Sequence, residues 1–133
     1  NNGLYYSTDG KNWTQSNITS DTFYAIYYAN GLWVTGSTGN NGLYYSTDGK
    51  TWTQSNQTSS SYDNSANKNI YFYNGTWVAG SETTAYYSTD GKNWTQSNLS
   101  DWVNMVLFID NKWIIVGNAG LYYSDAMEVE VDF

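Results

Sequence analysis

The chain is patterned as short runs of aromatic and β-branched residues separated by turn residues. Three related segments show this most clearly, YYANGLWVTGS, YFYNGTWVAGS and LFIDNKWIIVGN. The pairs at their centres, Asn30-Gly31, Asn74-Gly75 and Asp110-Asn111, tolerate the left-handed backbone that a two-residue hairpin loop requires. The pattern therefore predicts three β-hairpins. Counting outward from each turn gives the facing pairs Tyr28–Trp33, Phe72–Trp77 and Phe108–Trp113.

A second segment occurs three times almost unchanged, as YYSTDGKNWTQSNIT, YYSTDGKTWTQSNQT and YYSTDGKNWTQSNLS. Asp-Gly between alternating strand residues is a strong signal for a two-residue hairpin loop. The expected turn residues are Asp9 and Gly10, Asp48 and Gly49, and Asp90 and Gly91. Counting outward gives the facing pairs Tyr6–Trp13, Tyr45–Trp52 and Tyr87–Trp94. Three aspartates at one turn position indicate a structural role, because a catalytic residue rarely needs three copies.

The two kinds of hairpin alternate along the chain. Asp9, Asp48 and Asp90 lie 39 and 42 residues apart, and each interval holds one hairpin of each kind. Two hairpins in a period of about 40 residues make four antiparallel strands, which is the construction of a β-propeller blade. The sequence therefore predicts an all-β fold of tandem four-stranded antiparallel blades.

The chain holds about three and a half such blades in a single repeat domain, residues 1–133. The expected units are a c–d hairpin at 3–17, blades at 23–56 and 69–98, and a last blade at 103–133. The C-terminal strand of the last blade diverges, with an expected buried face of Met127, Val129, Val131 and Phe133. Propellers close with about 4 to 8 blades, so we expect a partial ring, an open array or an assembly of copies. The opening NNGLYY returns at 40–45, as expected of a mature piece or of a fragment cut within a repeat.

The copied segment S-T-D-G-K-x-W, with Tyr-Tyr before it, resembles the Asp-box (BNR) repeat of sialidase-like β-propellers. The matching residues of the first copy are Ser7, Asp9, Gly10 and Trp13. One residue fewer separates Asp from Trp than in the usual S-x-D-x-G-x-[ST]-W. The resemblance covers three repeats. It implies a turn between the two outer strands of a blade, away from any active site.

The composition excludes several classes of function. The chain has no His and no Cys, which removes Ser–His and Cys–His triads and His-based metal sites. It also has no Arg, so the arginine cluster of sialidases is missing and sialidase activity is excluded. A formal charge of -7 with 5 lysines gives no basic surface for nucleic acid. No apolar run approaches the ~18 residues of a membrane helix, and we expect no membrane insertion, cofactor or metal.

The loops that differ between repeats are the expected place for a ligand, because binding residues tend to lie on variable loops held by a rigid scaffold. The longest is QTSSSYDNSANKN in the second repeat. The candidate ligand-binding residues are Tyr62, Asp63, Glu82, Asp101 and Trp102. The alternative is an ordinary solvated loop, and Asp21 and Asp110 are expected to be solvated too. The regular Tyr and Trp ladder is expected to pack in the core rather than to stack on sugars.

One pattern survives where the copies diverge. Asn17-Ile18-Thr19, Asn56-Gln57-Thr58 and Asn98-Leu99-Ser100 keep the N-x-[ST] form while the middle residue changes. This is the acceptor pattern for N-glycosylation. Asn74, Asn12 and Asn93 also match and are the weaker candidates. The alternative for the three retained positions is an Asx or Ser/Thr turn that closes the outer strand, which would also require short polar side chains.

These features predict a non-enzymatic structural or adhesive module, secreted or displayed on a cell or virion surface. We expect it to associate with itself, head to tail or to complete a ring, and so to build a fibre or a larger propeller. The alternative function is a glycan-binding, lectin-like or glycosidase-type propeller. In that case the variable loops would hold the sugar through Tyr62 and Trp102, and paired carboxylates would be the only catalytic device.

Overall fold

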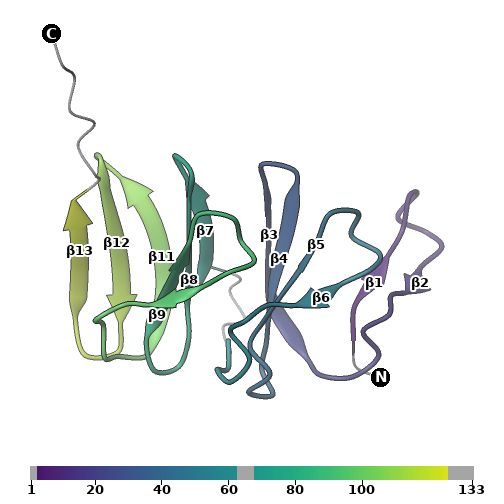
Figure 1. Cartoon of the computed structure of the whole chain (residues 1–133), viewed down its shortest axis with the longest axis horizontal. Helices are drawn as coiled ribbons and strands as arrows, with labels where there is room; N and C mark the ends of the chain where they lie inside the picture. Colours follow the sequence, from purple (N-terminus) through teal and green to yellow (C-terminus); the bar gives the residue numbers. More distant parts are fainter. Residues whose placement is uncertain (1–2, 63–67, 126–133) are drawn as a thin grey trace, which may run out of the picture.

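The computed structural model describes residues 3–62 and 68–125, and these residues form β-strands connected by turns and loops. Four separate antiparallel sheets follow one another in chain order and stand side by side along the long axis of the molecule (Figure 1). The expected all-β fold is confirmed. Over these ranges there is no helix, and thus none that could cross a membrane. The expected C-terminal strand face at Met127, Val129, Val131 and Phe133 lies outside the described residues.

We number the sheets along the chain. Sheet 1 contains β1 (Tyr5–Tyr6) and β2 (Thr14–Gln15). Sheet 2 contains β3 (Phe23–Ala29), β4 (Leu32–Ser37), β5 (Leu43–Ser46) and β6 (Thr53–Gln54). Sheet 3 contains β7 (Ile70–Tyr73), β8 (Thr76–Gly80), β9 (Ala85–Ser88) and β10 (Thr95–Gln96). Sheet 4 contains β11 (Val103–Ile109), β12 (Lys112–Gly117) and β13 (Leu121–Asp125). Each strand pairs with its sequence neighbours, so sheets 2 and 3 have the expected four-strand order.

The first kind of hairpin forms as the sequence predicts. Asn30 and Gly31 have φ angles of 52° and 75°, and the other two turns likewise have positive φ at both positions. The predicted partners face each other, in the pairs Tyr28–Trp33, Phe72–Trp77 and Phe108–Trp113. Their ring centroids lie 4.6, 4.9 and 5.2 Å apart, respectively. Such cross-strand aromatic contacts stabilise each hairpin by roughly 0.2–1 kcal/mol.

The second kind of hairpin differs from the prediction. Tyr6 pairs with Thr14 and not with Trp13, and the same shift places Tyr45 opposite Thr53 and Tyr87 opposite Thr95. Asp-Gly is therefore not a two-residue loop. Gly10 has a φ of 75°, but Asp9 is not among the described residues with positive φ, which a type I′ turn would require. A seven-residue turn from Ser to Trp takes its place, and side-chain oxygens stabilise it as described below.

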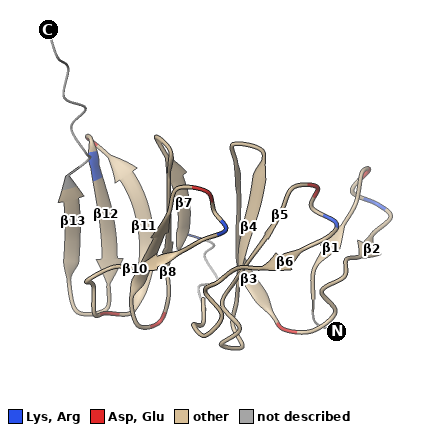
Figure 2. Ribbon diagram, in the orientation of Figure 1, with Lys and Arg blue, Asp and Glu red and all other residues tan. Residues whose placement is uncertain are grey.

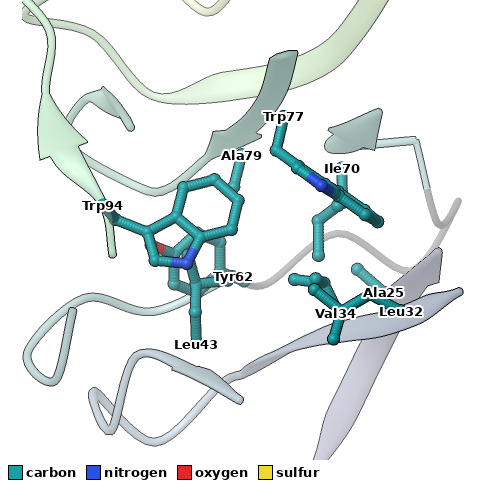
Figure 3. Close-up of a cluster of buried hydrophobic side chains, with 9 residues drawn as sticks. All are labelled: Ala25, Leu32, Val34, Leu43, Tyr62, Ile70, Trp77, Ala79 and Trp94. Atoms are coloured by element: carbon teal, nitrogen blue, oxygen red, sulfur yellow. The ribbon is translucent and has the colours of Figure 1, made fainter. Parts of the chain in front are cut away.

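The hydrophobic core lies between the sheets. Leu32, Val34 and Leu43 of sheet 2 meet Ile70 and Trp77 of sheet 3, and Tyr62 and Trp94 close the same cluster from the connecting loop and turn (Figure 3). A smaller cluster of Val78, Ala85, Val103 and Val106 joins sheet 3 to sheet 4. Sheets 2, 3 and 4 are thus joined by apolar burial, the dominant favourable term in folding. No sheet in the described residues closes on itself.

Aromatic contacts between sheets repeat with the same geometry. Tyr27 of β3 meets Trp77 of β8 edge to face, with centroids 6.0 Å apart and planes at 89°. Tyr71 of β7 meets Trp113 of β12 at the same distance and at 84°. This T-shaped arrangement suits the ring quadrupoles. Sheets 2 and 3 therefore each present a Tyr to a Trp of the sheet that follows.

Two glycines allow the connecting segments to approach the sheets closely. A Cβ added to Gly36 on β4 would lie 2.5 Å from the Tyr62 ring, and one added to Gly80 on β8 would clash with Val103. Tyr62 precedes sheet 3 and Val103 begins sheet 4, so each glycine faces the segment by which the chain enters the next sheet. The spacing between consecutive sheets thus depends on these small residues.

Candidate interface at the repeated turn

The copied segment builds a turn whose main-chain donors are satisfied by its own Ser and Asp. We call Ser7–Trp13, Ser46–Trp52 and Ser88–Trp94 the Ser-Asp turns. In each, the Ser hydroxyl donates to Asp Oδ1 at 2.9 Å and accepts from the Gly N–H. The same Oδ1 accepts two further main-chain N–H groups, those of Lys11 and Asn12 in the first copy, at 2.8 and 2.9 Å. Short polar side chains favour such local bonds over a ladder between strands.

These bonds keep the repeated aspartates deprotonated, so they are poor proton donors near neutral pH. The Asn12 main-chain N–H is the largest cause that lowers the pKa of Asp9, and the equivalent N–H groups of Thr51 and Asn93 lower the pKa of Asp48 and Asp90. Hydrogen bonds to a carboxylate favour its charged form. Each aspartate is therefore ionised near neutral pH and has its oxygens engaged in the turn. This geometry agrees with the structural role predicted from the sequence.

Two of the Ser-Asp turns also place a lysine over an aromatic ring. Figure 2 shows acidic and basic residues next to each other on the turns that follow β5 and β9. Lys50 Nζ lies 5.6 Å from the Tyr6 ring centroid, and Lys92 Nζ lies 5.5 Å from that of Tyr45. A cation over an aromatic face is attracted by the ring quadrupole. Each lysine thus reaches back to the tyrosine of the preceding sheet.

A paired hydrogen bond, here named the asparagine clamp, joins consecutive sheets. Asn17 Nδ2 donates to the Trp52 carbonyl at 2.9 Å, and Asn17 Oδ1 accepts from the Trp52 N–H at 2.8 Å. Asn56 repeats both bonds with Trp94, at 3.2 and 2.7 Å. One side-chain amide therefore satisfies both main-chain groups of a tryptophan in the next Ser-Asp turn. Because Trp52 and Trp94 pair with an asparagine, their main chains are not free to face Tyr45 and Tyr87.

The sequence pattern singles out these asparagines but predicts a different role for them. Asn17, Asn56 and Asn98 were predicted as glycosylation sites or as turn residues, and the retained asparagine was the available signal. The structure gives Asn17 and Asn56 a bond between sheets that neither alternative included. Their occupancy by glycan stays a prediction, as it does for Asn98, Asn74, Asn12 and Asn93. A glycan on Asn17 Nδ2 would have to coexist with the bond to Trp52.

The structure corrects the expectation that Tyr62 contacts a ligand. Its side chain is fully buried in the cluster between sheets 2 and 3, and its hydroxyl donates to Gln57 Oε1 at 2.6 Å. Burial also raises the pKa of this hydroxyl well above its ordinary value. An aromatic residue in a polar loop looks exposed in sequence, but the absence of a side chain at Gly36 leaves room for its ring. Asp63, its predicted neighbour, lies outside the described residues.

The remaining predicted residues lie on loops that main-chain bonds tie together. The Glu82 N–H donates to the Ser61 carbonyl at 3.1 Å, and the Asp101 N–H donates to the Thr83 carbonyl at 3.1 Å. The Asp101 carboxylate accepts from the Ala119 N–H at 2.9 Å and the Tyr122 hydroxyl at 3.0 Å, and the first of these is the largest cause lowering its pKa. Asp101 thus braces sheet 4. Trp102 is 37% exposed and is the residue of this group most accessible to a ligand.

A groove in the described part of the chain lies elsewhere. It has a volume of about 330 Å³ and is lined by inner-strand residues that include Tyr27, Tyr71 and Met105, with Lys68 at its edge. The predicted ligand residues that the structure describes, Tyr62, Glu82, Asp101 and Trp102, do not line it. No cluster of three or more acidic, His or Cys side chains that suits a metal occurs in the described residues.

Comparison with known proteins gives a likeness of fold. No protein-family model matches the chain, and no curated protein matches it in sequence. The chain is similar to the crystal structure of the computationally designed Ika4 protein, with a TM-score of 0.58 and 13% identity over 86% of this chain and 72% of that one. It also matches the computationally designed Ika8 protein, with a TM-score of 0.42 and 12% identity over 83% and 48% of the two chains. At this identity the likeness to Ika4 concerns the fold alone.

Proposed function

We propose that this chain is a non-enzymatic structural module whose sheets are the blades of a propeller-like array and whose surfaces associate with further copies of the chain. The observation that carries the proposal is the asparagine clamp, made once between sheets 1 and 2 and again between sheets 2 and 3. The residues that the chain copies most faithfully are used to build each turn and to attach it to the neighbouring sheet. An interface that is repeated inside a chain suits extension by more units.

The chemistry of the acids supports the same proposal. The repeated aspartates have lowered pKa values and accept several hydrogen bonds each, as does Asp101. A general acid in glycoside hydrolysis needs a raised pKa instead. The Ser-Asp turn also supports the Asp-box resemblance, since its Ser and Asp shape a turn between the two outer strands of a sheet. The extracellular location and the adhesive role remain part of the proposal and rest on the sequence patterns alone.

Light scattering coupled to size-exclusion chromatography tests the self-association. One chain has a mass of 15.0 kDa. We expect a mass of more than one chain that rises to a plateau with concentration. A mass of one chain at every concentration would refute the proposal for this polypeptide.

A second candidate function is glycan binding through the loop face. It rests on the exposed Trp102 beside Asp101, since an indole face can stack on a sugar ring. A glycan array separates the two functions. Selective binding that is lost in Trp102→Ala, with the secondary structure unchanged, would favour the glycan-binding function, whereas the structural proposal expects no selective glycan.

A further inference from the structure

The asparagine clamp has two partners, an asparagine side chain and a tryptophan main chain. Near each end of the described fold, one of these partners is present without the other. Asn17 and Asn56 hold Trp52 and Trp94, but the equivalent Asn98 has no side-chain partner within residues 3–62 and 68–125. At the other end, no asparagine in these ranges holds the main chain of Trp13. The side chain of Trp13 is 61% exposed, against 5% for Trp52 and 6% for Trp94. Within the described residues, Asn98 is thus an asparagine without a tryptophan to hold, and Trp13 is a tryptophan without an asparagine.

The lysine contacts leave a second complementary pair. Lys50 lies over Tyr6 and Lys92 lies over Tyr45, so the series continues with a lysine over Tyr87. Tyr87 is 45% exposed. Lys11, the first lysine of the series, lies over no ring in the described part of the chain. Lys11 and Trp13 belong to one Ser-Asp turn, and Tyr87 and Asn98 belong to sheet 3 and the segment after it. One Ser-Asp turn could therefore supply the partners of both Tyr87 and Asn98.

The edges of the strands show where such a unit would fit. In sheets 2 and 3, β5 and β9 each pair on one side with the preceding strand and on the other with the short strand that follows. In the described residues β1 pairs only with β2. The other edge of β1, which in sheets 2 and 3 would pair with the preceding strand, is therefore unpaired. β12 is the equivalent preceding strand of sheet 4, and β13 occupies its edge. An incoming β1 would therefore compete with β13.

β1 and β13 lie in segments of the same sequence and would have the same register, so they can pair with β12 in the same way. Residues 3–7, 42–46 and 120–124 all read GLYYS. Tyr45 faces Val34 between β5 and β4, and Tyr123 faces Ile114 between β13 and β12, so β13 sits in the register that β1 would adopt. The same main-chain bonds and the same side chains are therefore available to both strands.

Two side chains of β13 are more exposed than the equivalent side chains of other strands. Leu121 is 75% exposed and Tyr123 is 73% exposed, whereas the equivalent Leu43 is fully buried. Among the described residues β13 pairs with β12 alone. The β1–β2 hairpin, in contrast, brings its own outer strand and its own Ser-Asp turn. Replacing β13 would break the hydrogen bond from the Tyr122 hydroxyl to Asp101, for which the equivalent Tyr5 of the incoming strand supplies another hydroxyl. It would add the clamp, the lysine contact and the burial of Trp13.

We propose that a second copy of this chain docks its β1–β2 hairpin against β12 in place of β13, so that Asn98 clamps the incoming Trp13. The incoming Lys11 then lies over Tyr87. This inference rests on the proposed self-association and specifies its interface. Each copy supplies sheets 2 and 3 complete. The β1–β2 hairpin of one copy and strands β11 and β12 of the other together form a further four-stranded sheet. Two copies that exchange at both ends hold six four-stranded sheets, within the range of about 4 to 8 at which propellers close.

The test is to fasten β13 to β12 with a reversible bond. The chain has no cysteine, so Ile114→Cys with Tyr123→Cys introduces one defined pair at facing positions. Facing Cα atoms in an antiparallel ladder lie about 4.5–5.5 Å apart, within the range for a disulfide. Oxidation, verified by mass, is expected to convert the dimer to a monomer, and reduction is expected to restore the dimer.

A matched control fastens the same register inside sheet 2. Val34→Cys with Tyr45→Cys pins β5 to β4, and this variant is expected to dimerise whether oxidised or reduced. If the oxidised Ile114→Cys, Tyr123→Cys variant still dimerises, the strand exchange is wrong while self-association stands. If the unmodified chain is monomeric throughout, both are wrong. Loss of the dimer in the oxidised control as well would also overturn the exchange.

A second variant tests the contacts without a disulfide. Trp13→Ala is expected to raise the dimer dissociation constant about tenfold or more, because a buried aromatic anchor dominates many interfaces. The monomer should stay folded, since this side chain is mostly exposed. Trp102→Ala removes another exposed tryptophan outside the proposed interface and serves as the control. An unchanged dissociation constant in Trp13→Ala would overturn the proposed docking.

Discussion

Asn17 and Trp52 lie 35 residues apart in sequence, yet the side-chain amide of Asn17 pairs with both the N–H and the carbonyl of Trp52. The amide acts as a short additional strand that joins sheet 1 to the turn of sheet 2. Because Asn56 and Trp94 repeat the arrangement, the clamp is a rule of this fold and not an isolated contact.

The clamp should be measurable in the free energy of unfolding. Asn56→Ala is expected to destabilise the protein by about 1–3 kcal/mol, because it leaves the N–H of the nearly buried Trp94 without a partner. Urea unfolding followed by tryptophan fluorescence measures this. Asn98→Ala is the matched control and should leave the stability of the monomer unchanged at concentrations too low for association. Equal losses in both variants would show that the clamp is not the cause.

Stability should fall in acid partly through the Ser-Asp turns. The Thr51 N–H is the largest cause that lowers the folded-state pKa of Asp48. A lowered folded pKa stabilises the protein fully above the unfolded value of about 3.9, and this contribution is lost as the pH falls from there through the folded pKa. Asp48→Asn should therefore narrow the difference between urea midpoints at about pH 7 and about pH 3. Asp110→Asn is the control, and an equal effect there would contradict the assignment.

Gly36 should not tolerate a side chain. Gly36→Ala places a methyl group against the Tyr62 ring, and overpacking of this kind costs about 1–3 kcal/mol. A thermal melt or urea titration of the variant measures the loss. A Cβ at Gly120 would lie 4.0 Å from its nearest neighbour, the Tyr122 hydroxyl, so Gly120→Ala is the matched control with little expected effect. Full stability in Gly36→Ala would mean that Tyr62 can move without cost.

Tyr62 should contribute to stability and not to ligand contact. Tyr62→Phe removes the hydroxyl that donates to Gln57 Oε1 and leaves that oxygen without its partner inside the protein, a loss of about 1–2 kcal/mol. Tyr24→Phe, at a side chain that is 46% exposed, is the control with no expected change. The test is the free energy of unfolding of each variant, compared with that of the parent protein. A Tyr62→Phe variant as stable as the parent would contradict the buried role.

The hairpin turns show where sequence reasoning succeeds. Asn30-Gly31 and Asn74-Gly75 carry their own conformational preference, so the facing pairs Tyr28–Trp33 and Phe72–Trp77 follow by counting. The Ser-Asp turns show where it fails. Asp-Gly is compatible with a tight loop, but Ser7 two residues before Asp9 supports a wider turn, because its hydroxyl accepts from the Gly10 N–H and donates to Asp9 Oδ1. That serine was the signal that would have corrected the register.

In the candidate site, too, some features could be predicted from the sequence and others could not. Three aspartates at one turn position indicated a structural role, and their hydrogen bonds agree with it. The partner of Asn17 was not accessible to the same reasoning, because nothing local to Asn17 distinguishes a glycan acceptor or a turn residue from a donor to a distant main chain. Tyr62 likewise looked exposed because its loop is polar, and only its fit against Gly36 shows otherwise.

By itself the sequence determined the all-β class, the alternation of two hairpins and the positive φ angles of the Asn-Gly and Asp-Asn turns. These depend on strand periodicity and on backbone preferences within a few residues. The tertiary structure decided the width of the Ser-Asp turns, the burial of Tyr62 and the asparagine clamp. These depend on which sheet packs next to which, and a hydrogen-bonding side chain takes the partner that packing brings within reach. Trp52 turns its main chain to Asn17 because sheet 1 lies beside sheet 2, and no neighbour of Trp52 in sequence carries that information.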